Sequence, residues 1–119
     1  MLEAFVAEDV VEHQRGNSPG LDGVKAVANV LHRWMSDFSL TVEDVVVAGD
    51  VVWTRNRARG INTGSVMGLA PTNQPLEVDV FDVGRFENDK MVEHWGVADQ
   101  LGLLLQVGFD PRTAGRQRA

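Results

Sequence analysis

The residues that could carry chemistry gather late in this sequence, in the stretch DKMVEHWGVADQLGLLLQ at positions 89–106. If the part before the glycine is a strand, His94 and Trp95 point to opposite faces, because side chains alternate along a strand. Asp82 stands on the preceding apolar segment. A carboxylate beside His94 would raise the pKa of the imidazole and fix its tautomer. The pair is therefore a candidate proton shuttle, and the alternative is a structural histidine hydrogen-bonded within a sheet.

The turn near positions 87–90 decides which of these residues share a face. A slip of one residue exchanges the two faces of a strand. A two-residue loop would set Asp82 opposite Trp95, and a three-residue loop would set it opposite Gly96. We expect the three-residue loop, which places Asp82, His94 and Gly96 on one concave face and Trp95 on the outer face.

Two helices are expected to support this hairpin. Over positions 21–38 apolar residues recur every three or four places, which predicts an amphipathic helix that Asp22 can cap. A short apolar helix over 99–107 should end at Gly108. Asp99 stands at its start, where an N-cap role is a better interpretation than that of a catalytic acid.

The strands are predicted from β-branched, alternating segments. Positions 40–59 indicate two strands around a turn at 48–50, and 76–86 with 90–98 indicate a second hairpin. The order of helix, four strands and helix predicts an antiparallel sheet with helices on one face, an α+β fold. The apolar start of the chain leaves little room for a full first helix.

Length and composition set the class of protein. The 119 residues suit one domain, expected over 1–110, followed by a flexible basic tail over 111–119. The absence of cysteine excludes a disulfide framework and fits a cytoplasmic protein. The net charge of −6 argues against a nucleic-acid partner, and no apolar run is long enough for a membrane span.

Four segments, taken together and in this order, resemble the SnoaL-like polyketide cyclases of the nuclear-transport-factor-2-like superfamily. They are FVAEDVVEH (5–13), TGSVMGLAPT (63–72), DVGRFENDKMVEHW (82–95) and DQLGLLLQVG (99–108). The resemblance implies a cystatin-like cone, in which helices wrap a curved antiparallel sheet around an apolar pocket. Members carry a long helix before the first segment, and here we expect that helix to be short or missing. The resemblance also implies a homodimer through the outer sheet face, for which Phe81, Val83 and Trp95 are the candidates.

The resemblance also bears on the acid–base residues. In this family the catalytic aspartate stands two residues after the position of His94, where this chain has Gly96. The family's histidine on the preceding strand corresponds to Asp82. Asp82 could therefore supply the missing carboxylate from the neighbouring strand.

Further side chains are candidates for the pocket wall. Arg55 shares a face with Trp53; if that face is concave, the arginine needs an anionic partner, for which Asp82 is the nearest candidate. The alternative for that strand is a solvated outer face. His13 corresponds to a polar pocket position of the family, or else is a loop histidine. The full set of expected substrate-binding residues is His13, Trp34, Phe38, Trp53, Arg55, Met67 and Leu103.

Two functions follow from this set. The first is a SnoaL-like cyclase, isomerase or dehydratase that moves a proton beside the carbonyl of an apolar compound with the His94–Asp82 pair and no cofactor. The second is a non-catalytic protein that binds an apolar small molecule. We expect no metal site, because the histidines and carboxylates are scattered along the chain.

Overall fold

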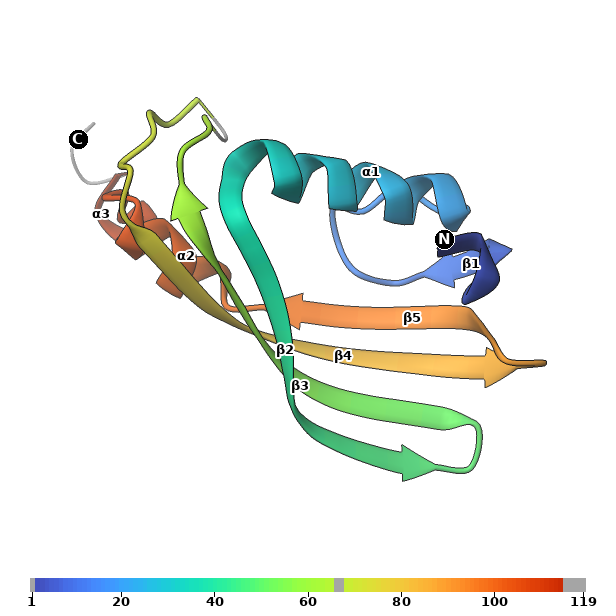
Figure 1. Cartoon of the computed structure of the whole chain (residues 1–119). Helices are drawn as coiled ribbons and strands as arrows, with labels where there is room; N and C mark the ends of the chain where they lie inside the picture. The colour runs from blue at the N-terminus through green and yellow to red at the C-terminus, as the bar shows by residue number, and fades with distance from the viewer. Residues whose placement is uncertain (1, 66–67, 115–119) are drawn as a thin grey trace.

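The computed structural model describes residues 2–65 and 68–114. A curved five-stranded sheet in the order β1-β5-β4-β3-β2 forms its centre, with α1 across one face and the shorter helices at one end (Figure 1). The elements are a 3-10 helix Leu2–Ala4, β1 Val6–Glu12, α1 Gly20–Trp34, β2 Met35–Ala48, β3 Val51–Asn62, β4 Pro75–Glu87, β5 Lys90–Ala98, α2 Gln100–Gln106 and α3 Pro111–Ala114. The fold is α+β, as predicted. In this part of the chain no helix has the length and apolar character needed to span a membrane.

The first strand was not predicted. β1 pairs with β5 in parallel, so the sheet has five strands and is not purely antiparallel. Its partner lies about eighty positions later in the chain, and local patterns do not reveal a pairing of that separation. Before β1 the structure has one turn of 3-10 helix, Leu2–Ala4, where a short or missing first helix was expected.

Helix α1 differs from its prediction at both ends. It begins at Gly20 after an N-cap at Pro19, so Asp22 lies in the first turn and does not cap it. A Cβ added to Gly23 would come within 1.8 Å of the backbone oxygen of Ser18, so this turn packs too closely for a side chain. The helix ends at Trp34, which leaves Phe38 on β2 instead of on the helix.

The register between β4 and β5 is the predicted one, for a different reason. The loop is the two-residue one, Asn88-Asp89, and both residues have positive φ, as in a type I′ turn. A register shift between Arg85 and Phe86 then leaves Val92 as an extra residue on β5. The bulge restores the pairing of Asp82 with Gly96.

The core is divided into two apolar clusters. One contains Trp34, Met35, Ala58, Leu76, Val78 and Leu103, and the other contains Val6, Val10 and Leu21. In the first, the indole of Trp34 donates to Oδ1 of the buried Asn62 at 2.7 Å. Helix α2 closes over this cluster, and the side chain of Asp99 caps it by accepting from the backbone N–H of Gly102 at 2.9 Å, as predicted. Beyond it, the first part of the expected tail forms the helical turn α3.

Candidate functional site

The polar residues of the concave face form one hydrogen-bonded network between the two apolar clusters. His94 on β5 and Asp82 on β4 are brought together, with Nε2 of the imidazole 2.8 Å from Oδ1 of the carboxylate. The pairs Asp82–Gly96 and Gly84–His94 place the two side chains diagonally on one face. The glycines at both partner positions leave room for the side chains to meet.

Neutral groups on β3 complete one side of the network. Asn56 is 3% exposed and donates through Nδ2 to Oδ2 of Asp82 at 2.7 Å. The same amide nitrogen donates to Oγ1 of Thr54 at 3.0 Å. These two residues alternate with Arg55 along β3, so they face inward where the arginine faces outward. Asp82 is thus held from both neighbouring strands.

A second carboxylate reaches His94 from the opposite side. Oε1 and Oε2 of Glu12, on β1, lie 2.8 and 2.9 Å from Nδ1 of the imidazole. The hydrogen bond to Asp82 and, after it, the interaction with Glu12 raise the pKa of His94, and partial burial opposes this effect. The histidine therefore holds its proton to a higher pH than an exposed one.

Two polar side chains, those of Gln14 and Asp82, lie directly beside the backbone of Gly96. A Cβ at position 96 would lie 2.3 Å from Oε1 of Gln14 and 2.8 Å from Oδ1 of Asp82. The space beside the backbone of Gly96 is thus occupied by the ends of two side chains from other strands and loops. A carboxylate oxygen stands beside this position although residue 96 carries no side chain.

Three expected lining residues lie in the apolar core. Trp34 and Leu103 are buried in the cluster beneath α2, and Phe38 packs against it. They line neither of the two cavities described below, and they pack in this cluster as ordinary core residues do. Met67 lies outside the described residues.

Three others lie on the outer side of the sheet. Trp53 is exposed, and Arg55 pairs with Asp44 at 2.6 Å instead of with Asp82. The ring of His13 stacks on Trp95 at a centroid distance of 4.7 Å. Trp53 and Arg55 face outward because side chains alternate along β3, and its inward face carries Thr54 and Asn56. The parallel pairing of β1 explains His13, which follows the inward-facing Glu12.

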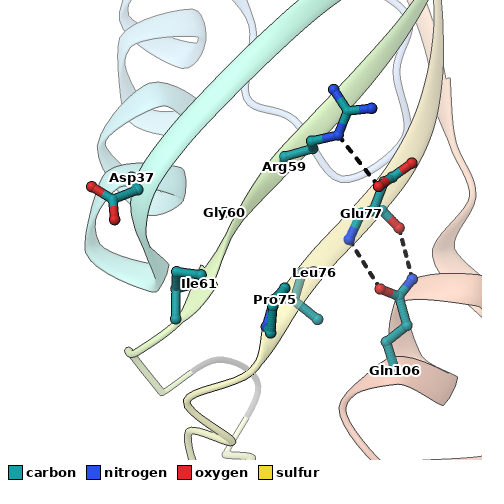
Figure 2. A pocket seen from close by; sticks show the side chains of 8 residues that line it. All are labelled: Asp37, Arg59, Gly60, Ile61, Pro75, Leu76, Glu77 and Gln106. Atoms are coloured by element: carbon teal, nitrogen blue, oxygen red, sulfur yellow. Dashed lines mark hydrogen bonds and ion pairs between the residues drawn. The ribbon is translucent and has the colours of Figure 1, made fainter.

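Two cavities lie away from the network. One, of about 430 Å³, opens where β3 and β4 reach α2, and Gln106 there donates to the backbone oxygen of Glu77 at 2.7 Å and accepts from its N–H at 3.0 Å (Figure 2). It is lined by Asp37, Arg59, Gly60, Ile61, Pro75, Leu76, Glu77 and Gln106. The other, of about 590 Å³, lies at the start of α1. Neither is lined by His94 or Asp82.

Sequence reasoning missed Glu12 and Asn56 as members of the network. Asn56 could have been found by assigning the arginines of β3 to the outer face, since the residues between them must then face inward. Glu12 stands two residues after the buried Val10 on β1, and a charged residue at such a position indicates a buried partner. That signal needs β1 to be recognised as a strand first.

The curved sheet with helices on its concave side is the nuclear-transport-factor-2-like fold, which ketosteroid isomerases share. A protein from Catenulispora acidiphila with a ketosteroid isomerase-like fold superposes with a TM-score of 0.73 at 15% identity, over 91% of this chain and 79% of that one. At this identity the likeness concerns the fold alone.

Within this fold, the model of the SnoaL-like polyketide cyclases matches residues 1–107, and the chain belongs to that family. TsrD from Streptomyces laurentii is similar, with a TM-score of 0.82 and 26% identity over 90% of this chain and 80% of TsrD. IdmH from Streptomyces antibioticus, a proposed polyketide cyclase, is 32% identical with a TM-score of 0.78, over 91% of this chain and 85% of IdmH. Among curated proteins none matches this chain in sequence. The family match supports a SnoaL-type function.

Proposed function

We propose that this protein is an acid–base enzyme of the SnoaL type that moves a proton beside the carbonyl group of an apolar compound. The observation that carries the proposal is the contact of 2.8 Å between His94 and Asp82 on the concave face. The family match supports a SnoaL-type function, and the network holds a carboxylate next to Gly96. The proton transfer itself needs no cofactor, because a carboxylate and an imidazole suffice for it.

Asp82 is the group that we expect to exchange the proton with the substrate. A carboxylate has about four lone-pair sites, and Asp82 uses one oxygen for His94 and the other for Asn56. It is also partly exposed, whereas Glu12 is closed off from solvent. In the proposed reaction the carbon–hydrogen bond next to the carbonyl breaks, the proton passes to Asp82, and Asp82 returns it to the product.

The experiment measures proton exchange on an apolar ketone. Incubating 2-tetralone with the protein in D₂O and following the loss of its α-proton signals by NMR reports proton abstraction directly. We expect exchange above the buffer rate that falls by about 10²–10⁴-fold, the usual range for general acid–base help, in Asp82→Asn. Asp79→Asn is the control, because that carboxylate lies on the same strand but pairs with Arg57. Equal rates in both variants would contradict the role of Asp82.

A second function has a specific observation in its favour. The family's acid position is Gly96 in this chain, and the cavities described above do not include the network. We propose non-catalytic binding of an apolar small molecule as the alternative. Saturable binding of 2-tetralone, seen as line broadening, with no exchange above buffer would favour it.

We also propose that two copies associate through the outer face of the sheet. The apolar outer patch consists of Val46, Trp53, Phe81, Val83, Trp95 and Val97, which lie on four adjacent strands. Ion pairs border it, with Arg85–Glu93 on one side and Arg55–Asp44 on the other. An apolar patch with a polar rim suits an isologous interface between identical subunits.

A further inference from the structure

Glu12 approaches His94 through the one parallel pairing of the described sheet. β1 and β5 bring these two residues to opposing positions, and the side chain of Glu12 is only 4% exposed. Its Oε1 also accepts from the backbone N–H of Gln14 at 2.8 Å. The carboxylate of Glu12 is therefore held by two partners, the backbone N–H of Gln14 and the imidazole of His94. The fold thus fixes its orientation toward His94.

The contacts of His94 define its charge state. A carboxylate oxygen only accepts hydrogen bonds when ionised, and a neutral imidazole has one donor nitrogen and one acceptor. Nδ1 of His94 faces Glu12 at 2.8 Å, and Nε2 faces Asp82 at 2.8 Å. Both nitrogens must donate for both contacts to be favourable, which requires the imidazolium.

We propose that Glu12 is a positioning residue that keeps His94 protonated and directs its Nε2–H at Asp82. His94 then orients the carboxylate and does not itself remove a proton from the substrate. The role in the reaction rests on the proposed function, whereas the effect on the charge of His94 does not.

Other charged groups near His94 act elsewhere. On β5 the neighbouring Glu93 faces outward and contacts His13 and Arg85. From β3 the network receives only the neutral Thr54 and Asn56. In α1 the charged residues of the first turns, Asp22 and Lys25, line the cavity at the start of that helix, together with Glu3, Glu8 and Lys90. Glu12 and Asp82 are therefore the carboxylates that act on the imidazole.

The test is an NMR titration of the imidazole nitrogens in the intact protein labelled with ¹⁵N-histidine. In the wild type, both nitrogens of His94 should show imidazolium shifts at about pH 6.5, the usual histidine pKa. In Glu12→Gln, whose amide oxygen can still accept from Nδ1–H, the titration midpoint should fall by about one unit, a tenfold change in proton affinity. Neutral His94 in the wild type, or an unchanged midpoint in Glu12→Gln, would overturn the proposal.

Glu93→Gln is the matched control. It removes the same charge from the residue next to His94, but from the opposite face, where the carboxylate contacts His13 at 2.6 Å. The control should leave the titration of His94 unchanged. If Glu93→Gln moves His94 as much as Glu12→Gln does, the effect is not specific to Glu12 and the proposal fails. The wild-type spectrum decides the charge state even if Glu12→Gln does not fold.

A kinetic measurement separates this proposal from the proposed function. If the wild type exchanges the α-protons of 2-tetralone, the alkaline limb of the pH profile should move down in Glu12→Gln by the same amount as the NMR midpoint, with KM unchanged. Glu12→Asp, which retains the charge, should restore part of the wild-type profile. If the wild type exchanges no protons, the proposed function fails while the titration still decides the effect of Glu12 on His94. An unmoved profile in an active Glu12→Gln would overturn its positioning role.

Discussion

Asp82 and Gly96 lie side by side on neighbouring strands, and the proposed role of Asp82 rests on this proximity. The family places an acid at the position of Gly96, and here Oδ1 of Asp82 lies within 2.8 Å of where a Cβ at that position would stand. The His94–Asp82 contact was predictable, because a correct register is enough to bring the two side chains together. Glu12 was not, because its approach depends on a strand pairing between the two ends of the chain.

The loss of the imidazole should be costly because it leaves a buried carboxylate without a cation. In His94→Leu, Glu12 would keep its buried position without its charged partner, and we expect a loss of about 3 kcal/mol in the free energy of unfolding. Urea denaturation of the wild type and of His94→Leu at about pH 6 measures this difference in the free energy of unfolding. His13→Leu is the control, since its pair with Glu93 lies at the surface, where solvent screens it, and should contribute much less to stability. A similar small loss in both variants would contradict this view of the network.

The difference in the free energy of unfolding between the wild type and His94→Leu should depend on pH. Hydrogen bonding to Asp82, and then to Glu12, raises the pKa of His94 in the folded protein. Its stabilisation is therefore complete below the usual histidine pKa of about 6.5 and is lost as the pH rises through the raised value. The difference in stability between the wild type and His94→Leu should be larger at about pH 6 than at about pH 9.

At the level of elements, the β4–β5 hairpin determines which face each residue of the site occupies. Two features oppose each other there, a two-residue turn that alone would send His94 outward and a bulge at Val92 that turns it back. The pairing of Asp82 with Gly96 was predicted from the sequence, but it was attributed to a three-residue loop. A bulge of one residue leaves little local signal, so it was not predicted. The helices and hairpins were predicted from periodicity and turn residues, whereas the parallel β1 depends on contacts distant in sequence.

The turn itself offers a test of this geometry. Asp89 has a φ of 65°, a left-handed conformation that glycine adopts without steric cost. Asp89→Gly should therefore stabilise the protein by about 0.5–1 kcal/mol, seen as a rise in Tm. Asp50→Gly is the control, because Asp50 occupies the corresponding turn between β2 and β3 without a positive φ. A higher Tm in Asp50→Gly than in Asp89→Gly would contradict the assigned turn.

The whole molecule exposes more surface than a monomer of its size normally does. Its accessible area is 7874 Å², whereas about 6,400 Å² is typical for 13.1 kDa. Its radius of gyration is 15.9 Å, compared with about 13.5 Å for a compact domain of this length. The end of the β2–β3 hairpin, which extends beyond the helices, contributes to both values (Figure 1). This excess of about 1,500 Å² on one chain is larger than the roughly 800 Å² that each partner buries in a standard protein interface.

The proposed dimer can be tested with two residues of matched exposure. Phe81 is 55% exposed within the apolar outer patch, and Val45 is 56% exposed on the concave side. Sedimentation equilibrium at micromolar concentration should show a dimer for the wild type and for Val45→Glu, and a monomer for Phe81→Glu, because the charge would be buried without a partner. A wild-type monomer, or a dimer that only Val45→Glu disrupts, would contradict the outer face as the interface.

The position of β2 at the edge of the sheet has a consequence for how the protein behaves when concentrated. Its consecutive residues Val45, Val46 and Val47 are all more than half exposed, so this edge strand is apolar on both faces. Association through the outer patch would cover the middle residue and leave the other two and the strand's free backbone groups accessible. Such an edge can template the addition of further strands. We therefore expect fibrillar aggregation to begin at this edge, where a lysine in place of Val47 would act as a gatekeeper.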